Sequence, residues 1–385
     1  MQASAVPSST PPGRQLPPAI GCAVRREVAP EPRGVYFDTA LGLWVASGSQ
    51  LVAEVLAHPA CRACEAARLV SALCAAACFP ANPAGAAAAA CPGRLEGLVA
   101  ALLEGVLPAQ VRELARDCAA TSLKAAGGAL QGGALTLYCQ AVPAHVLGRV
   151  LGAQSCDLQR LSHWAVSRLP CSSPQASEDQ HLQGRRAAQE LVAYMAALMD
   201  TPPGGVPGHE VLTRLKALSL RRRDLPVTQV LARLALLFYQ VHEASSELIA
   251  ATLLALHLHP ELASLAKAEP VLLPLLVREV LRQSPPLRQA MRLMAEDMVL
   301  AGERVAAGDT VLLLLAATRR PCTGTRGFQL DRKSAKVFTF GAQPFASPGQ
   351  MMAETIAAEA VRALLRAGLD LGRLGYGTGP WPTAT

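Results

Sequence analysis

Aromatic residues are scarce in this chain of 385 residues: phenylalanine, tyrosine and tryptophan together make up 4% of it, although 51% of its residues are hydrophobic. The core must therefore be aliphatic, built from leucine, alanine and valine. No stretch interleaves aromatic with basic residues, the pattern by which proteins stack on the bases of single-stranded nucleic acids and neutralise their backbones. We expect no nucleic-acid binding, and we attribute the modest net charge of +7 to solvated helix faces.

Secretion and membrane signals are also missing from the sequence. Residues 1–20 are rich in serine and proline and contain no apolar run of the kind that follows the basic residues of a signal peptide. The longest apolar helix that we expect carries Glu243 and Glu247 near its middle, where a lipid-facing span tolerates charge poorly. We expect a cytoplasmic protein that does not associate with membranes.

Cysteine, in contrast, is abundant, with 11 residues at irregular spacings. Since no secretion signal precedes them, we expect reduced thiols. The pairs Cys61-x-x-Cys64 and Cys74-x-x-x-Cys78 place four soft ligands close together, a spacing that is typical of metal sites. Cys74 and Cys78 fall in alanine-rich helical sequence, however, where cysteine behaves as a small buried hydrophobe. We expect no metal here, and metal binding by this cysteine cluster stays the alternative.

Apolar periodicity predicts a mainly α-helical fold with a minor β-sheet. We interpret residues 1–30 as a flexible proline-rich leader, 31–375 as a single domain and 376–385 as a flexible tail. The chain shows no internal repeat and no clear linker between domains.

Several individual elements are predicted from these patterns. A helix that Ser49 caps should run to about His58. Residues 229–258 should form one long helix, about 45 Å in length at 1.5 Å per residue. The other predicted elements are a hairpin of residues 35–38 and 43–46, a helix from Pro274 to about Gln283, a strand-turn-strand over 298–309, and a strand over 310–316.

The centre of the long predicted helix is polar although its ends are apolar. Gln240, His242, Glu243 and Ser245 lie in this window. Unpaired polar groups inside a buried helix are costly, so this window requires partners or a function. We interpret His242, together with His257 and His259 further along, as packed or exposed helix residues rather than metal ligands.

Residues 340–349 read Phe-Gly-Ala-Gln-Pro-Phe-Ala-Ser-Pro-Gly and precede a helix of small residues over 350–367. This loop follows the polar-centred helix and a Glu279-x-x-Arg282 pair. In this order, these segments resemble the cytochrome P450 family, whose haem-ligand loop is Phe-Gly-x-Gly-x-His/Arg-x-Cys-x-Gly. The resemblance extends from about residue 34 to residue 370. It implies the cytochrome P450 fold, in which Glu279 and Arg282 hold their helix against the following meander.

The departures from the family pattern concern haem. In the family, the cysteine thiolate of the loop binds iron and donates the electron density that favours O–O cleavage. Ser347 stands at that position here, and Phe345 stands where the family has a His or Arg that pairs with a haem propionate. Ala90 stands where a second propionate-binding histidine is expected, and Gln343 replaces a glycine of the loop.

Other positions of the haem site match the family. The resemblance implies that Phe340, Gly341 and Gly349 keep the frame of the loop and that Arg94 and Arg292 remain to meet propionates. The acid–alcohol pair of the family corresponds to Glu243 and Ala244, with Ser245 as the nearest hydroxyl.

The resemblance leaves three functional hypotheses. The first is a haem-free auxiliary protein that binds and activates a partner enzyme, such as a glycosyltransferase of a bacterial natural-product pathway, because the family includes haem-less members of this kind. The second is an oxidoreductase holding haem b with abnormal serine or water ligation. The third is a haem-independent enzyme or small-molecule binder that uses the distal pocket, with Glu243 as general acid or base and Ser245 as a hydrogen-bonding group. We expect no cofactor under the first hypothesis.

Overall fold

The protein is described by a computed structural model. It describes residues 34–39, 41–63, 92–127, 130, 133–172, 176–201, 210–221, 225, 227–287, 289–315, 328, 330, 337–342, 347, 349–376 and 382–384. The predicted leader lies outside these residues, as do Cys64, Cys74 and Cys78.

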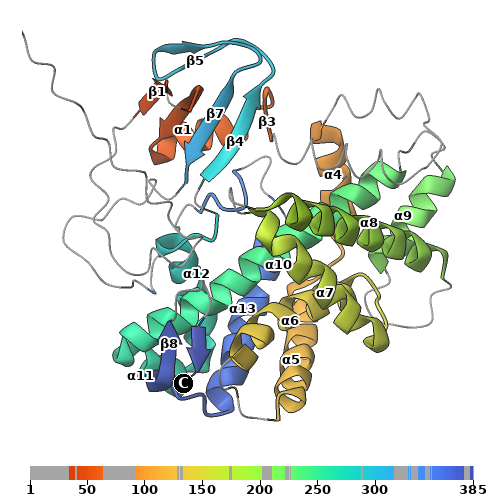
Figure 1. Cartoon of the computed structure of the whole chain (residues 1–385), viewed down its shortest axis with the longest axis vertical. Helices are drawn as coiled ribbons and strands as arrows, with labels where there is room; N and C mark the ends of the chain where they lie inside the picture. Colours follow the sequence, from red (N-terminus) through yellow and green to blue (C-terminus); the bar gives the residue numbers. More distant parts are fainter. Residues whose placement is uncertain are drawn as a thin grey trace, which may run out of the picture.

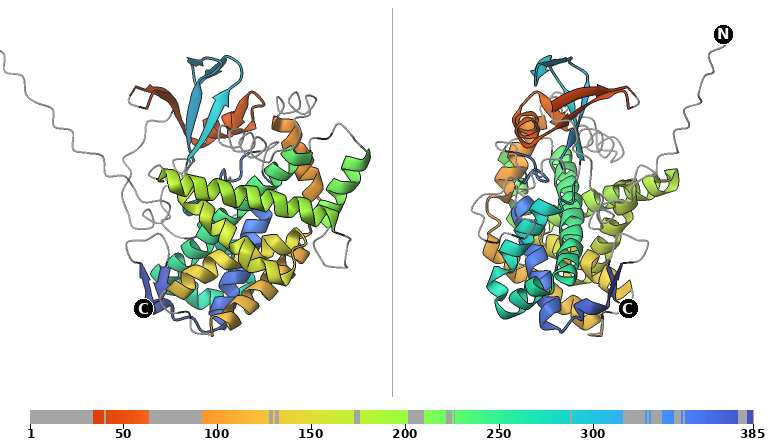
Figure 2. Two further views of the ribbon diagram at one scale, coloured as in Figure 1. Left: turned by 45° about the vertical axis from the view of Figure 1, so that its right-hand side comes forward. Right: turned by 90° about the vertical axis from the view of Figure 1, so that its left-hand side faces the viewer.

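Helices form most of the described structure, as the sequence predicts (Figure 1). Their bounds are α1 (Ser49–Ala57), α4 (Pro92–Leu103), α5 (Pro108–Ala125), α6 (Gly133–Val150), α7 (Leu158–Arg168), α8 (Glu178–Asp200), α9 (Glu210–Arg221), α10 (Val227–Leu258), α11 (Pro260–Ala268), α12 (Leu273–Gln283) and α13 (Gly349–Arg366). The views in Figure 2 agree that α10 runs through the middle of the helical body.

The main sheet lies at one end of that body and joins segments far apart in the sequence (Figure 1). Its strand order is β1-β2-β7-β4-β3, and β2 pairs in parallel with β7 whereas the other pairs are antiparallel. Two further ladders pair β5 with β6 and β8 with β9. The bounds are β1 (Gly34–Asp38), β2 (Leu43–Ser47), β3 (Cys61–Ala63), β4 (Gln289–Met294), β5 (Met298–Leu300), β6 (Glu303–Val305), β7 (Thr310–Leu314), β8 (Leu374–Tyr376) and β9 (Pro382–Ala384).

These elements confirm the predicted hairpin, the long helix, the helix after it that ends at Gln283, and the strands after residue 297. The predicted serine cap is wrong: Ser49 is the first residue of α1, and Gly48 precedes it with φ 98° and no side-chain cap. The flexible tail is also wrong for Pro382–Ala384, because this segment pairs with β8 as strand β9. Neither correction was visible in the sequence, since both depend on backbone conformation and pairing.

The helical core is built around α10, which packs against α4, α6, α8, α12 and α13. A second core lies between α1 and the main sheet. In the described part of the chain no single helix is long and apolar enough to cross a membrane; only the pair α10 and α11, bent by 111° at their junction, passes that test together.

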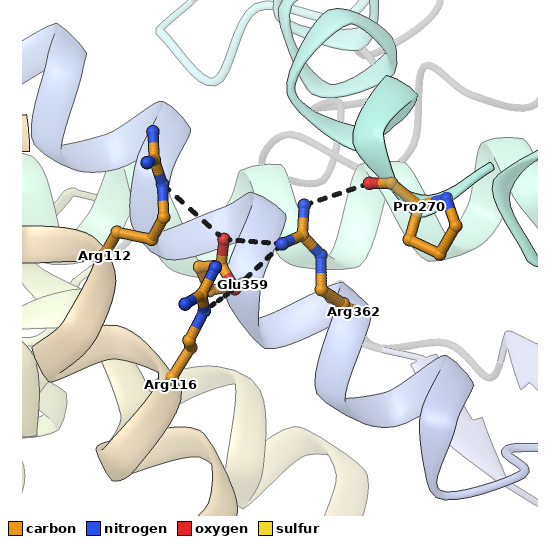
Figure 3. Close-up of polar contacts among 5 residues, drawn as sticks. All are labelled: Arg112, Arg116, Pro270, Glu359 and Arg362. Carbon is orange, nitrogen blue, oxygen red and sulfur yellow. Dashed lines mark hydrogen bonds and ion pairs between the residues drawn. The ribbon is translucent and has the colours of Figure 1, made fainter. Parts of the chain in front are cut away.

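Helix α13 is tied to α5 through the buried carboxylate of Glu359 (Figure 3). Its oxygens lie 3.0 Å from Arg116 Nε of α5 and 3.1 Å from Arg362 Nη1 of α13. Arg112 Nε, at 3.9 Å, is a looser partner, and Arg362 also donates to the Pro270 carbonyl at 2.9 Å. The cluster therefore joins α5, α13 and the turn before α12.

A second buried carboxylate connects α13 with α12. Glu354 accepts hydrogen bonds from Arg278 Nε at 3.2 Å and Arg278 Nη2 at 3.0 Å. Gln350 Nε2 donates to its other oxygen at 2.8 Å. Both acids of α13 thus fix the helix whose first residue, Gly349, is the last residue of the Ser347 loop, which is our name for residues 340–349.

Replacing Glu359 with glutamine should lower the free energy of unfolding by about 3 kcal/mol, since guanidinium groups would then lie beside a buried neutral amide. This loss is at the low end of the cost of breaking a buried ion pair, because the Arg116 side chain is half exposed. Urea unfolding measures the change. Glu210→Gln, which removes an exposed ion pair of α9, is the matched control and should cost less than about 0.5 kcal/mol. Equal effects of the two variants would contradict the structural role of Glu359.

Candidate functional site

The backbone of the Ser347 loop is held by its own hydrogen bonds. The Gly341 amide donates to the Phe338 carbonyl at 3.0 Å, and the Ser347 amide donates to the Phe340 carbonyl at 2.6 Å. Gly341 has φ 88°, a conformation that disfavours residues with a Cβ. Phe340 is buried in the helical core. The loop frame that the sequence singled out is therefore a closed turn anchored by one aromatic ring.

The Ser347 hydroxyl is used at the start of α13. Its Oγ accepts a hydrogen bond from the Gly349 amide at 3.2 Å. The first amides of a helix have no intrahelical partner, and serine satisfies them well. A serine hydroxyl stays protonated at neutral pH and is a hard, weak donor toward iron. Ser347 thus has a local structural role that requires no metal.

The Ser347 loop meets the centre of α10 through Gly349. A Cβ placed on Gly349 would lie 2.5 Å from Val241 Cγ2 and 3.4 Å from Leu237 Cδ1. The glycine is therefore required by the close approach of the two helices. This contact confirms the prediction that the long helix passes the Ser347 loop. Sequence reasoning missed Val241 and Leu237, because nothing in their pattern separates them from ordinary core residues.

One stripe of α10 reaches the surface of the described structure. Gln240 is exposed and Glu243 and Glu247 are half-buried, whereas nearly all their neighbours in the helix are buried. Spacings of three and four residues put these side chains on one face. Two carboxylates and an amide therefore lie on one face of the helix, which differs from the face of Leu237 and Val241 that meets Gly349. The role of Glu243 as a general acid or base stays a prediction.

Ser245 does not join this stripe. It is fully buried, and its hydroxyl donates to the Val241 carbonyl of the preceding turn at 2.5 Å. Residues two apart in a helix point about 200° apart, so Ser245 and Glu243 face different surroundings. Ser245 lies four residues after Val241 and shares its face of the helix, and a role of Ser245 toward a ligand stays a prediction.

His242 is a packed core residue, as predicted. Its Nε2 lies 2.9 Å from the Gln140 carbonyl of α6, and since a carbonyl only accepts, Nε2 carries the proton. Pro143 lies inside α6 and lacks an amide proton, which disturbs the helix hydrogen bonds beside Gln140. Burial lowers the pKa of His242 to about 4. The ring is therefore neutral, and Nδ1 has no partner among the described residues.

His257 and His259, the other two histidines of the sequence prediction, also contact nearby residues. His257 Nδ1 lies 2.7 Å from the Leu371 carbonyl, which fixes the end of α10. His259 packs edge-on against Phe328 and lies 3.2 Å from Glu261. Neither histidine is placed on the polar stripe of α10.

Glu279 and Arg282 form the predicted ion pair within α12. Arg282 Nε and Nη2 donate to the two carboxylate oxygens at 2.8 and 2.6 Å, and Gln283 Nε2 donates to one of them at 2.9 Å. Glu279 is 3% exposed, so these hydrogen-bond donors, and not water, stabilise its negative charge. The meander that this pair is expected to hold lies outside the described residues.

The expected propionate partners are only partly described. Arg292 is half-buried on β4, and its Nη1 donates to the Met291 carbonyl at 3.0 Å. Arg94 lies in α4, but its side chain is outside the described part of the structure, as are Ala90, Gln343 and Phe345. The propionate roles of Arg94 and Arg292 stay predictions.

The described donors do not fit a thiolate-ligated haem. The loop offers the hydroxyl of Ser347, and the described cysteines belong to other segments: Cys61, Cys118, Cys139, Cys156 and Cys171. Burial raises the pKa of Cys61 and of Cys118 to about 11, and that of Cys139 to about 12. Among the residues that the structure describes, no three His, Cys, Asp or Glu side chains converge as a metal site would require.

Comparisons with known proteins identify the family. The sequence is 32% identical to a cytochrome P450 of Xylella fastidiosa over 176 residues, 43% of this chain and 42% of the relative. It is 32% identical to the vitamin D(3) 25-hydroxylase of Pseudonocardia autotrophica over 185 residues, 48% of this chain and 44% of that protein. No protein-family model matches the sequence.

The fold comparison agrees. The solved structure of P450BioI in complex with an acyl carrier protein ligated to hexadec-9Z-enoic acid superposes with a TM-score of 0.69 at 21% identity, covering 87% of each chain. The chain is thus similar in sequence to cytochrome P450s and has their fold. Its sequence alignments span between 42% and 63% of the length of the curated relatives it matches, so their activities do not transfer directly.

Gly349→Ala should destabilise the protein by about 1–3 kcal/mol, since the new methyl group would overpack against Val241. Thermal and urea unfolding measure the change. Adding Val241→Ala makes room for the methyl group, so the double variant should recover part of the loss. Gly97→Ala in α4 is the matched control, because a Cβ there meets nothing within 4 Å and should stabilise the helix slightly. No difference between Gly349→Ala and this control would refute the close approach.

Stability should fall with acid because of His242. Its pKa is about 4 when folded and 6.5 when free, so the unfolded chain binds more protons between these values. Unfolding is therefore favoured progressively as pH falls from about 6.5 to 4, by up to about 3 kcal/mol from this group. His242→Gln should flatten this part of the stability profile relative to the wild-type protein, whereas His259→Gln should not. Parallel profiles for all three proteins would contradict a buried neutral His242.

Proposed function

We propose that this member of the cytochrome P450 family works without thiolate-ligated haem and acts on a partner enzyme, such as a glycosyltransferase of a bacterial natural-product pathway. The observation that carries the proposal is Ser347. Its hydroxyl caps α13 at the position where the family pattern places the iron-binding thiolate. The protein is then an auxiliary activator rather than a monooxygenase.

The segments of this chain that match the family pattern support this proposal. The Gly341 turn, the Gly349 contact with α10 and the Glu279–Arg282 pair maintain the architecture whether or not iron is bound. Departures at Ser347, Phe345 and Ala90 fall on cofactor positions instead of scattering over the surface. A chain that keeps its packing but loses its cofactor contacts is best explained by a role for its surface.

The fold is compatible with a protein partner. P450BioI was solved in complex with a ligated acyl carrier protein. Another structural neighbour, with a TM-score of 0.69 at 20% identity, is described as an unusual P450-like monooxygenase of microbial secondary metabolism. These neighbours support natural-product chemistry as the setting, while the glycosyltransferase itself follows from the family resemblance.

Two other functions are supported by particular observations. Relatives named as hydroxylases and monooxygenases favour an oxidoreductase that holds haem b through serine or water. Such an enzyme would lack the electron donation that a thiolate supplies. The exposed stripe of Gln240, Glu243 and Glu247 favours a haem-independent enzyme or small-molecule binder in which Glu243 transfers protons.

Haem content tests the proposal. The protein purified from haem-supplemented cells should carry little haem and give no thiolate-type band after reduction with carbon monoxide. Ser347→Cys alone should give weak, unstable incorporation, because a partly buried propionate without a charged partner costs several kcal/mol. Adding Phe345→His and then Ala90→His should raise haem occupancy in steps. Ser264→Cys, which adds a cysteine on exposed α11, is the matched control and should give no thiolate spectrum.

The same preparations separate the three functions. Stoichiometric haem in the wild-type protein would move the oxidoreductase to first place, and full occupancy in Ser347→Cys alone would show that the propionate contacts are intact. A haem-free protein should increase the activity of a glycosyltransferase encoded beside it. If that activity does not change, and Glu243→Gln abolishes small-molecule binding, the third function replaces the proposal.

A further inference from the structure

Three sulfur atoms meet at the edge of the main sheet, away from the Ser347 loop. Cys61 Sγ of β3 lies 3.7 Å from Met294 Sδ of β4 and 3.7 Å from Met298 Sδ of β5. Cys61 and Met294 are buried, and Met298 is half-buried. We call this group the Cys61 sulfur cluster.

Backbone pairing fixes the positions of the three side chains. Cys61 and Met294 are direct cross-strand partners in the antiparallel ladder of β3 and β4, so their side chains share one face. The Ala295 amide donates to the Ala60 carbonyl at 2.8 Å and holds the turn that follows. Met298 then enters from β5, which is paired with β6. The convergence results from rigid strands rather than from a loop.

Both methionine thioethers contact the Cys61 thiol. The core around the cluster is aliphatic, with side chains such as Val52, Val55 and Leu300. The Cys61 thiol has one proton, so it can donate to one thioether at a time. The second thioether lies equally close and gains nothing from that proton. Two thioethers that both contact one thiol form a set of soft ligands.

We propose that the Cys61 sulfur cluster binds a soft monovalent metal ion, Cu(I), through one thiolate and two thioethers. In a planar three-coordinate site, metal–sulfur bonds of about 2.3 Å at 120° place the sulfur atoms about 4.0 Å apart. The observed 3.7 Å requires an expansion of a few tenths of an ångström. On binding, the S–H bond of Cys61 breaks, its proton leaves to solvent and a copper–sulfur bond forms, with no change in oxidation state.

The ligand set and the surroundings select Cu(I) over Zn(II). Thiolate and thioether ligands suit Cu(I), whereas protein zinc sites use thiolate, imidazole and carboxylate. One thiolate and one monovalent cation make a neutral complex, which an apolar core accepts. A divalent ion would leave a net positive charge, and a buried unpaired charge is costly. Met298, being half-buried, gives the ion a route into the cluster.

The proposed copper site does not depend on the proposed partner function. It gives a metal-binding role to one cysteine of the pattern seen in the sequence. Of the four spaced cysteines that suggested a metal site, the structure describes Cys61 and gives it methionine partners from a region more than 200 residues away. The proposal depends on the two methionines, because their thioethers make this cysteine better suited to copper than a thiol without such neighbours.

Competition with a chromophoric Cu(I) chelator tests the proposal on the full-length, fully reduced protein under anaerobic conditions. Met298→Leu conserves volume at a half-buried position and should weaken binding of the first Cu(I) equivalent at least about tenfold, by analogy with the loss of supporting groups at metal sites. Cys61→Ser should weaken it further. Zn(II) affinity should not respond to Met298→Leu.

Two matched controls separate this cluster from the other thiols. Met291→Leu changes an exposed methionine of the same strand β4, and Cys156→Ser removes an exposed cysteine; both should bind the first equivalent as the wild-type protein does. Thermal unfolding without metal verifies that each variant is folded. Unchanged Cu(I) affinity in Met298→Leu would overturn the proposal even if Cys61→Ser fails to fold. An equal loss in Met291→Leu would overturn it as well.

Discussion

The close approach of α10 and α13 at Gly349 positions everything in the candidate site. Because Gly349 has no side chain, Val241 and Leu237 lie against the start of α13. This contact brings the Ser347 loop to the centre of the longest helix. The Phe340 ring, the Gly341 turn and the Ser347 amide then hold the loop from the other side.

Charged side chains hold α13 in this position. Glu354 and Glu359 are buried on the helix, and arginines from α12, α5 and α13 itself neutralise them. Buried acids of this kind fix orientation more than they add stability, because desolvation offsets most of the attraction between the charges. The α13 scaffold is thus specified by packing and by directional hydrogen bonds. All of these contacts are made between side chains and backbone of the chain itself.

Ser347 contributes to the architecture through both its backbone and its side chain. Its backbone amide closes the loop and its hydroxyl caps α13, and both functions stabilise the helix that contacts α10. The polar residues at the centre of α10 fall into two groups. His242 and Ser245 satisfy backbone carbonyls inside the core, while Gln240, Glu243 and Glu247 face outward.

The sequence by itself determined the helical class, the order of the elements, the Glu279–Arg282 pair and the family, because these follow from periodicity and from residue types at short spacings. It also located the loop at Ser347 and the polar window of α10. The degree of burial of each of those polar residues depends on the tertiary structure: Ser245 is fully buried, whereas Gln240 is exposed. Tertiary structure also brought Met294 and Met298 to Cys61. Contacts between distant segments depend on strand register and helix approach, and no local pattern encodes those.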